Sequence, residues 1–553
     1  LTAMLPVAFT FGPAGWQWSG PPLVWNQAEA SLDERTIFQV GFSPGKEDGV
    51  SGAGQGAIAQ YQRITSLLGF SPDVHARLIV LENTGVLWGS TALSQPGDRV
   101  ASVNAGEIKL VYSEAISTSL GLQDSLVQLA LAESGVNEAL APWLWQGLPL
   151  AMQGYDQSIA TQGRFIPALQ EGLAPGSLPT DLVSSWAATA YLQERLGWDG
   201  LGNFIIRLGE LCQEDCDPQG ALDAALLEFL ALDAADFETV WQSAWQNRLE
   251  NAQAALDALL SARSLALSSG NEQALLGTID RGVPNLEVEE LHWLEDYHAN
   301  PPQQYQLTGR PLAFLEGGSL LAEMTLEYQP DEGDSTTTSF TSLLTPSERG
   351  YYWAGPLLEL LQGERVDILY PNSQADLAVI LLAQAEQIAA RLGAALDISL
   401  DERLIIKLYE TPASYQASIA GSLPQTNVEN AWTSPGESIK LNIIVGGGAE
   451  DYTGLLAYQL SRSLLYQSGL EAGWLVEGVS ATLSRSYELA PSSRPSGLQI
   501  AELFAAVNHG QTPALNDILP SLQLPGERLA LDRGLARDDV DFMVTEYGWP
   551  ELL

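Results

Sequence analysis

The stretch that decides the fold is VQLALAESGVNEALAPWLWQG, residues 127–147, because a second part of the chain repeats it in the same register. Residues 458–478 read YQLSRSLLYQSGLEAGWLVEG. Three landmarks keep one offset of 331 positions: Gln128-Leu129 becomes Gln459-Leu460, Trp143-Leu144 becomes Trp474-Leu475, and Gly147 becomes Gly478. A shared register of this length indicates that one structural domain occurs twice.

The repeat extends toward the N-terminus of both stretches. At the same offset EIKL, Glu107–Leu110, becomes SIKL, Ser438–Leu441. Further upstream, ARLIVLEN at residues 76–83 resembles ERLIIKLYE at residues 402–410, and a change of a few residues in spacing fits a variable loop. Short runs of Ile, Leu and Val between helical stretches predict buried strands. Each copy is therefore expected to be an α+β domain.

A second, weaker repeat precedes each copy. GWQWSGP at residues 15–21 recurs as GYYWAGP at residues 350–356, an offset of 335. The second instance closes a segment of about a hundred residues, which is a typical domain size. We expect this segment to open with a helix over residues 271–279 and helical turns around Trp293. It should continue through strands in LAFLEGG, LLAEMTLEYQ and STTTSFTSLLT, with a polar hairpin loop before the last of them.

Both ends of the sequence are expected to fall inside domains. Residues 1–25 read as the final strands of an earlier copy of the small segment. EYGW at residues 546–549 matches RLGW at residues 195–198, after which the first copy continues through DFETVWQSAWQNRLENA, residues 236–252. We therefore expect a piece of a longer repetitive polypeptide, whose second large domain is incomplete at its C-terminus.

Length and charge exclude several classes of function. At 553 residues the chain is too long for one hydrophobic core, and size alone suggests three or four domains. The formal net charge is −43, from 25 Lys+Arg and 68 Asp+Glu. Such a surface repels phosphate backbones and anionic lipid headgroups, so we predict no nucleic-acid partner. Because no stretch approaches 18 consecutive apolar residues, we also predict no membrane span in this sequence.

The two cysteines, Cys212 and Cys216, stand just before Asp217-Pro218, where a helix should be ending. Residues four apart in a relaxed last turn are close enough for a disulfide. The alternative, a pair of metal ligands, lacks a nearby His or further Cys to complete it. A disulfide is the favoured interpretation, and it suits an oxidising compartment.

The order of elements in each copy, ending in APWLWQGLPLAM and AGWLVEGVSATL, resembles the peptidase-MA-like domains of the gluzincin (thermolysin-type) metallopeptidases. In that family a helix carrying HExxH is followed by a segment of the form P-x-W-L-x-E-G-x-A. The resemblance implies large peptidase-like domains over residues 26–255 and 363–553. The segment between them, residues 256–362, resembles the curved-sheet cone domains of the nuclear-transport-factor-like kind, and residues 1–25 would be the end of another cone.

An active gluzincin uses two His at i and i+4 of one helix and a downstream Glu to hold Zn²⁺, and the Glu after the first His deprotonates the metal-bound water. The shared register places this motif at residues 127–131 and 458–462, each starting sixteen residues before the landmark Trp. Neither place can hold zinc or supply the base by this route. The residues at the motif and third-ligand positions are Val127, Gln128, Leu131 and Gln146 in the first copy, and Tyr458, Gln459, Arg462 and Glu477 in the second.

Arg462 and Glu477 would lie where metal and ligand meet in an active relative, and they could form an ion pair that replaces zinc structurally. A second interpretation is a reused cleft that binds a peptide or glycan, with Tyr458 as a stacking surface. A double substitution that melts the domain without altering any binding would favour the structural role.

Other residues that could form a catalytic or metal site give weaker signals. Four histidines occur, and none stands at a motif position or in an i, i+4 pair with another: His75, His292, His298 and His509. His292 and His298 flank Glu295 and Asp296, where a metal site is conceivable, but a solvated helix face or a helix-end histidine is the favoured interpretation. No P-loop and no G-x-S-x-G nucleophile motif is present in the sequence.

The sequence therefore predicts a non-catalytic structural or binding protein without a cofactor or metal, of an extracellular or cell-envelope surface, with protein partners or self-association. Two alternatives remain open at this point. One is a zinc metallopeptidase that acts through an unconventional site or another repeat. The other is a pseudoenzyme that captures a peptide without cutting it.

Overall fold

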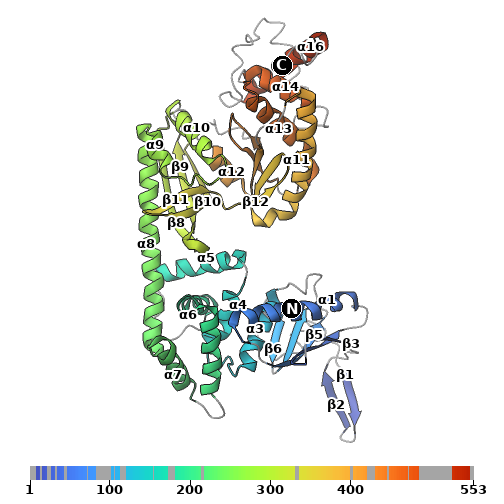
Figure 1. Cartoon of the computed structure of the whole chain (residues 1–553), viewed down its shortest axis with the longest axis vertical. Coiled ribbons are helices and arrows are strands. Elements are labelled where there is room, and N and C mark those ends of the chain that lie inside the picture. The colour runs from blue at the N-terminus through green and yellow to red at the C-terminus, as the bar shows by residue number, and fades with distance from the viewer. Residues whose placement is uncertain are drawn as a thin grey trace. The chain divides into compact units, whose positions relative to one another are not determined.

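The computed structural model describes most of the chain and divides it into two compact units, unit 1 (residues 1–249) and unit 2 (residues 250–553). Helices and strands are mixed in both units, as the predicted α+β class requires (Figure 1). The described residues are 8–12, 15–20, 26–31, 34–42, 47–70, 73–81, 101–104, 106–111, 120–153, 155–171, 181–212, 217–299, 301–329, 335–398, 403–419, 430–444, 447–470, 473–484 and 526–547.

Unit 1 is built on a twisted sheet whose described strands follow the order β3-β4-β5-β7-β6. The central strands β4, β5 and β7 are parallel, while the two edge strands run antiparallel to their neighbours. The parallel strands carry alternating or continuous buried apolar residues, as expected for strands covered by helices. The strand bounds are β3 Asn26–Ser31, β4 Thr36–Phe42, β5 Val74–Leu81, β6 Ala101–Asn104 and β7 Glu107–Val111.

The helices of unit 1 cover this sheet and then each other. α1 packs on β3 and β4, α3 packs on β6 and β7, and the two helices touch. α4 packs on α6, which Asp181 caps by accepting from the backbone N–H groups of Val183 and Ser184. The bounds are α1 Glu47–Leu68, α3 Leu120–Glu133, α4 Pro142–Ala151, α5 Tyr155–Glu171, α6 Leu182–Leu211, α7 Pro218–Leu230 and α8 Ala234–Ser269.

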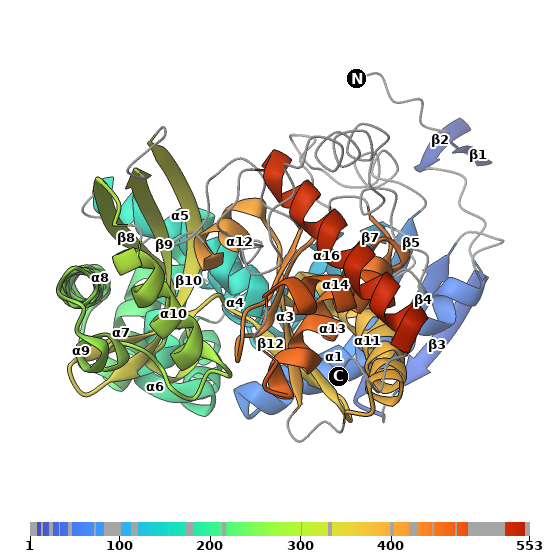
Figure 2. The same ribbon diagram turned by 90° about the horizontal axis from the view of Figure 1, so that it is seen from above.

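Unit 2 contains a sheet of described strands in the order β12-β13-β14-β16-β15, with a parallel centre and antiparallel edges. α11 and α13 pack on it and against each other, α14 packs on α13, and α16 crosses α14 (Figure 2). The short helix α12 contacts β14 and β16. The bounds are β12 Glu359–Gln362, β13 Val366–Tyr370, β14 Leu404–Tyr409, β15 Ala431–Trp432, β16 Ile439–Asn442, α11 Ala375–Leu396, α12 Pro412–Ile419, α13 Thr453–Gln467, α14 Gly473–Ser484 and α16 Gly526–Tyr547.

A second sheet of unit 2, β11-β10-β9-β8, is antiparallel and curves around α8 and α10. Its inner face and the C-terminal half of α8 share one apolar core, which includes Leu256, Leu260, Met324 and Trp353. The bounds are α9 Glu272–Leu276, α10 Leu286–Ala299, β8 Gln304–Phe314, β9 Leu320–Gln329, β10 Thr336–Ser347 and β11 Gly350–Gly355. The loop between β9 and β10 lies outside the described residues.

Two hairpins share one register and one irregularity. In unit 1, β1 (Ala8–Gly12) pairs with β2 (Gly15–Gly20), and the register shifts between Ala8 and Phe9. In unit 2, β10 pairs with β11, and the register shifts between Leu343 and Leu344. The two shifts stand at the offset of 335 positions at which the sequence motif of these hairpins recurs.

Two glycines at the sequence landmarks allow two helices to cross closely. A Cβ atom at Gly147 of α4 would lie 2.1 Å from the carbonyl oxygen of Ser185 in α6. A Cβ atom at Gly478 of α14 would lie 2.3 Å from the carbonyl oxygen of Ala536 in α16. Neither distance is possible for a real side chain, so both crossings require glycine.

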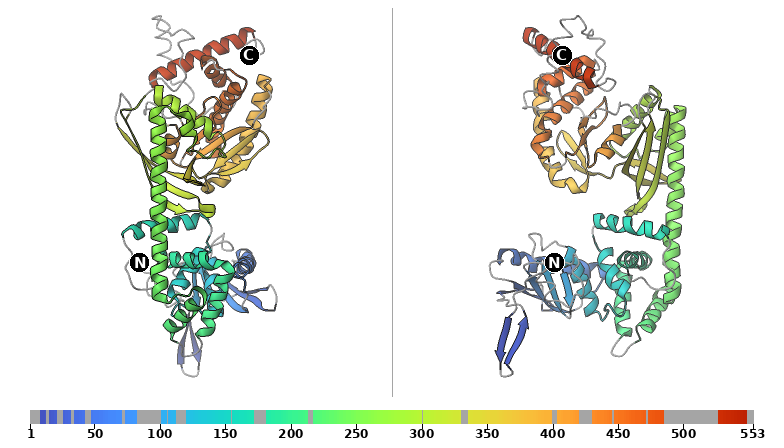
Figure 3. Two further views of the ribbon diagram at one scale, coloured as in Figure 1. Left: turned by 60° about the vertical axis from the view of Figure 1, so that its left-hand side comes forward. Right: turned by 180° about the vertical axis from the view of Figure 1, so that it is seen from behind.

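The helix α8 belongs to both units, since the boundary between them falls after Leu249 (Figure 3). In unit 1 its Trp241 and Trp245 are buried, and in unit 2 its Leu256 and Leu260 are buried. An unbroken helix of 36 residues therefore contributes side chains to two hydrophobic cores.

Among the residues that the structure describes, one helix is long and apolar enough to cross a membrane by length and hydropathy alone, residues 372–396. It does not contain 18 consecutive apolar residues, because Asp376, Gln384 and Glu386 interrupt the run. In the structure one face of this helix, which includes α11, is buried against the sheet and α13.

Candidate functional site

The motif positions of unit 1 lie on α3 and form part of an apolar interior. Val127 and Leu131 are fully buried. Gln128 donates from Nε2 to the carbonyl oxygen of Trp145 at 3.4 Å, and Gln146 is half-buried on α4. Val127 and Leu131, at the positions that the sequence predicts for the two histidines, are thus core residues, together with the landmark Trp143, which is also fully buried.

The motif positions of unit 2 lie on α13 and form a buried polar cluster with α14. Arg462 donates from Nη1 to Oε1 of Glu477 at 2.7 Å, and both side chains are about 5% exposed. The Tyr458 hydroxyl donates to the other oxygen of the same carboxylate. The ion pair that the sequence allows is therefore present, and both oxygens of Glu477 are engaged.

Aromatic rings surround the guanidinium group of Arg462. Its Cζ lies 5.9, 5.7 and 5.8 Å from the ring centres of Trp432, Tyr458 and Tyr466. A second nitrogen, Nη2, donates to the Tyr466 hydroxyl at 3.0 Å. Contacts of a cation with aromatic faces and a carboxylate offset the cost of burying its charge. Tyr458 therefore belongs to the buried cluster of Arg462 and Glu477.

The residues at these positions do not fit zinc. Val127 and Leu131 have no lone pair to donate, and Arg462 is permanently cationic and bound to the carboxylate of Glu477. Gln459, at the position that the sequence predicts for the general base, donates from Nε2 to the carbonyl oxygen of Ala431 at 3.1 Å. Within the described part of the chain, no group of three or more His, Cys, Asp and Glu side chains is arranged to hold a metal ion.

The three histidines that the structure describes differ in their surroundings. His75 is exposed on β5. The sequence favoured a solvated helix face or a helix end for His292 and His298. His298 stands in the last turn of α10 and contacts the carbonyl oxygen of Leu267 through Nε2 at 3.0 Å. His292 lies neither on a solvated face nor at the helix end, because its Nδ1 lies 2.9 Å from Oε1 of Glu437, a residue 145 positions away. The correction arises because α10 packs against the loop before β16, and sequence periodicity does not show which side of a short helix a distant segment covers. His509 lies outside the described residues.

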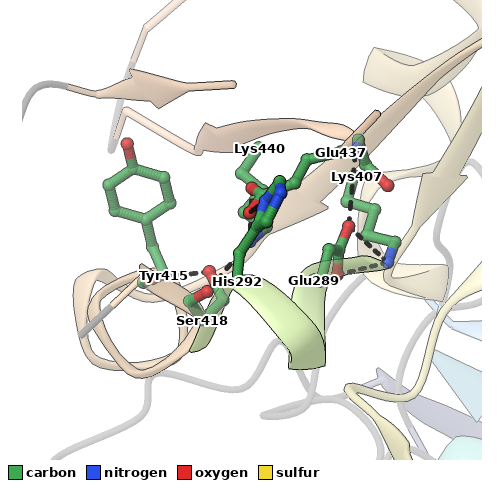
Figure 4. Close-up of polar contacts among 8 residues, drawn as sticks. Glu289, His292, Lys407, Tyr415, Ser418, Glu437 and Lys440 are labelled. Atoms are coloured by element: carbon green, nitrogen blue, oxygen red, sulfur yellow. Dashed lines mark hydrogen bonds and ion pairs between the residues drawn. The ribbon is translucent and has the colours of Figure 1, made fainter. Parts of the chain in front are cut away.

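Figure 4 shows the polar network around His292, in which α10 faces the strands β14 and β16. Glu289 of α10 accepts two hydrogen bonds from Nζ of Lys407 on β14, at 2.9 and 2.8 Å. The same carboxylate accepts from the backbone N–H of Ser438 at 3.3 Å. The Lys407 side chain is only 3% exposed, so this ion pair is buried.

The second half of the network continues from Glu437. Its Oε2 lies 3.2 Å from Nζ of Lys440 on β16, and Nζ also donates to the carbonyl oxygen of Ser418 at the end of α12. Two carboxylates and two ammonium groups are thus buried together, and His292 adds a titratable group at the edge. The network joins α10, α12 and the sheet.

Burial and pairing shift the pKa values in this network. The hydrogen bond with Glu437 raises the pKa of His292 although burial opposes it. Burial alone would raise the pKa of Glu437, but Lys440 and His292 together lower it. Burial lowers the pKa of Lys407, and the contact with Glu289 offsets only part of that effect. For Lys440 burial acts in the same downward direction, but Glu437 and Glu289 outweigh it and raise the pKa.

Sequence reasoning missed this network, although a signal was present. The chain has few lysines, and Lys407 and Lys440 stand inside the apolar runs LIIKLY and SIKLNII. A lysine within a buried strand requires an acidic partner. The partner of Lys407 is 118 positions away, so no local pattern identifies it.

A cavity of about 350 Å³ opens beside this network in unit 2. Its walls come from the curved sheet, from α10 and from α12, and they are mainly apolar and aromatic. Rings of Trp293, Tyr305, Phe340 and Trp353 line it, together with Lys407. The sequence does not predict this cavity, because the wall residues are spread over more than 150 positions.

Of the two cysteines, the structure describes Cys212. α6 ends at Leu211, and Asp217 caps α7, so the helix ends where the sequence predicted. Cys212 follows the last helical residue, but Cys216 lies outside the described residues. The disulfide between them stays a prediction.

Comparison with known proteins gives a distant structural likeness. No protein-family model and no curated protein sequence matches this chain. Two structures of a mutant M1 zinc metallopeptidase from Deinococcus radiodurans are similar, one of them bound to a Tyr-Ser-Ala substrate. They share 17% and 15% sequence identity with this chain, with TM-scores of 0.29 and 0.28. Each match covers 40% of this chain and 52% of that chain, so the match spans about half the length of that peptidase.

Proposed function

We propose that this chain is a non-catalytic binding or scaffolding protein built from degenerate metallopeptidase-like domains. One observation carries the proposal: the positions where the shared register puts the zinc ligands hold fully buried Val127 and Leu131 in unit 1, and a buried Arg462–Glu477 ion pair in unit 2. Side chains so engaged offer neither a metal ligand nor a general base. The ion pair occupies the place of the metal and stabilises the domain.

The arrangement of elements supports the proposed repetition. Both large sheets have a parallel centre of three strands and antiparallel edges. In unit 1 α1 contacts α3, α3 contacts α4, and α4 contacts α6, and in unit 2 α11, α13, α14 and α16 contact one another in the same succession. The glycines at the two closest helix crossings, Gly147 and Gly478, are landmarks of one register.

An extracellular or cell-envelope location and protein partners or self-association are parts of the same proposal. A net charge of −43 keeps a large protein dispersed and disfavours association with nucleic acid. The predicted Cys212–Cys216 disulfide would suit an oxidising compartment. Sedimentation of the purified chain would separate a self-assembling scaffold from a protein that captures other partners.

Metal analysis of the purified chain tests the central claim. We expect no stoichiometric zinc and no chelator-sensitive proteolysis. A rebuilt variant supplies the positive control: Tyr458→His, Gln459→Glu and Arg462→His restore HExxH at residues 458–462 and keep Glu477 as the third ligand. This variant should bind about one zinc ion per chain.

Two outcomes would contradict the proposal. Stoichiometric zinc in the original chain, with proteolysis that a chelator abolishes, would establish an unconventional peptidase site. Failure of the folded rebuilt variant to bind zinc would show that residues 458–462 and Glu477 are not the equivalents of the peptidase ligands.

A further inference from the structure

The walls of the cavity in unit 2 are mainly apolar. The aromatic side chains of Trp293 and Phe340 and the aliphatic side chains of Leu307, Leu326 and Leu358 line it. Its volume of about 350 Å³ is within the range of small-molecule sites, roughly 300–1,000 Å³. An apolar concave surface of this size fits a ligand with a largely apolar body.

The charges in the wall are already paired with each other. Arg263 donates from Nη2 to Glu290 at 2.7 Å, and Lys407 binds Glu289 through two hydrogen bonds. These side chains are 9% exposed or less. Since each cation has its own carboxylate, a charged ligand would have to compete with a buried ion pair, and a neutral ligand would not.

The guanidinium group of Arg263 is held in the wall by its neighbours. Its Cζ lies 4.6 Å from the ring centre of Trp353, and Nη1 donates to Thr278 at 3.2 Å. Its Nε–H is buried and has no hydrogen-bond acceptor among the residues that the structure describes. Because protein atoms enclose this nitrogen, the wall offers a ligand mainly apolar and aromatic surface.

We propose that this cavity is a binding site for a neutral small molecule with a largely apolar body. The apolar body lies against the aromatic walls. This site is separate from the motif positions on α13, and its occupancy does not depend on whether the chain is catalytic.

The neutral fluorophore N-phenyl-1-naphthylamine, which brightens in apolar surroundings, tests the site on the full chain. It should bind with one site per chain. 1-Decanol should displace it, whereas decanoate and decylamine at equal concentration should displace it at least about tenfold less well. Binding that is absent, or stronger for either charged competitor than for decanol, would overturn the proposal.

Variants locate the bound probe. Ala417→Trp on α12 and Leu358→Trp before β12 each add a large side chain at a half-buried wall position, and each should weaken probe binding about tenfold or more. The matched control is Leu265→Trp, an exposed position of α8 outside the cavity, which should leave binding unchanged. Unchanged binding in both wall variants, with an unaltered circular dichroism spectrum, would place the probe elsewhere.

Discussion

At the scale of single residues, α13 and α14 of unit 2 show how a charged pair can remain buried. Glu477 on α14 would be an isolated buried carboxylate if α13 carried only apolar residues, and such a charge is strongly disfavoured. Arg462 supplies the opposite charge, and Tyr458 satisfies the second oxygen. In unit 1 the equivalent problem does not arise, because Gln146 is neutral and Val127 and Leu131 are apolar.

Removing one partner of the Arg462–Glu477 pair should therefore lower the free energy of unfolding of unit 2 more than the loss of the interaction alone would. Arg462→Ala or Glu477→Ala alone is expected to destabilise unit 2 by about 3–5 kcal/mol, because each leaves a buried charge without its partner. The double variant should lose clearly less than the sum of the two. Hydrogen exchange of α13 amides in a double-mutant cycle measures this, and Tyr458→Phe, expected to cost about 1 kcal/mol, is the mild control. Strictly additive losses would show that the two side chains do not interact.

The contact between His292 and Glu437 should make stability depend on pH. The folded state raises the pKa of His292, so its stabilisation is complete below the unfolded value of 6.5 and is lost as pH rises through the raised pKa. Glu437 has the opposite sign: its lowered pKa stabilises above 4.5 and fails as pH falls through it. Glu295, Asp296 and Lys440 also act on these two groups.

His292→Gln isolates the histidine, because glutamine can still donate a hydrogen bond to Glu437 but does not titrate. The original chain should exceed this variant in melting temperature at about pH 5.5, and the difference should shrink by about pH 8.5. A difference that stays constant or grows as pH rises would contradict the expected sign.

The sequence allowed the Arg462–Glu477 ion pair but did not predict the charged network, for a physical reason. The register shared by residues 127–147 and 458–478 is read from the sequence alone, and it singles out Arg462 and Glu477 without any structure. The pairing of Lys407 with Glu289 depends on how α10 packs against a sheet whose strands come more than a hundred positions later. The apolar neighbours of a lysine in the sequence predict that it is buried, but they do not identify the carboxylate that pairs with it.

At the scale of elements, the two close helix crossings are the strictest requirement on the sequence. α4 crosses α6 at Gly147, and α14 crosses α16 at Gly478, with backbone against backbone. Larger residues there would push the helices apart and open the cores beneath them. The Trp-Leu dipeptide that precedes each glycine by a turn lies against the same cores: Trp143 is fully buried and Trp474 is partly buried.

Gly147→Ala and Gly478→Ala should each destabilise the unit that contains them, by about 1–3 kcal/mol or more. Gly52→Ala is the matched control, because it also lies inside a helix but has no atom within 4 Å of the added methyl group. That control should stabilise α1 by about 0.5–1 kcal/mol. Chemical denaturation of the three variants measures the effects, and a neutral result for both crossing glycines would mean that the helices separate without cost.

Element boundaries were the weaker part of the sequence prediction. LAFLEGG was expected to form a strand, whereas β8 begins earlier, at Gln304, and ends at Phe314. Gly317 and Gly318 have φ values of 71° and 84°, which an extended strand does not contain, and they turn the chain into β9. The expected helix over residues 271–279 shortens to α9, because the chain then turns so that Ile279 can bridge to Trp353 of β11.

At the scale of the whole molecule, charge opposes compactness. The chain carries 43 more acidic than basic side chains, and their mutual repulsion is greater in the folded state than in the expanded unfolded state. The buried carboxylates Glu289, Glu437 and Glu477 are paired, so the repulsion comes from the exposed acidic residues. Salt should weaken it, because the screening length falls to about 10 Å at 0.1 M.

Raising NaCl from about 20 mM to about 300 mM should therefore raise the melting temperature of the full chain. CaCl₂ at matched ionic strength distinguishes screening from specific binding, and the two salts should give similar curves. A melting temperature that falls with NaCl would show that the surface ion pairs stabilise more than the net charge destabilises. A much larger rise with calcium would reveal a cation site.

The helix α8 limits where the protein can be divided into recombinant fragments. Because the boundary after Leu249 falls inside a helix, a fragment ending there would leave the carbonyl groups of its last turn without donors. A recombinant unit 1 should therefore extend to Ser269, and a recombinant unit 2 should begin no later than Ala234. The two fragments share all of α8, so neither unit can be exchanged between related genes as a module bounded by loops.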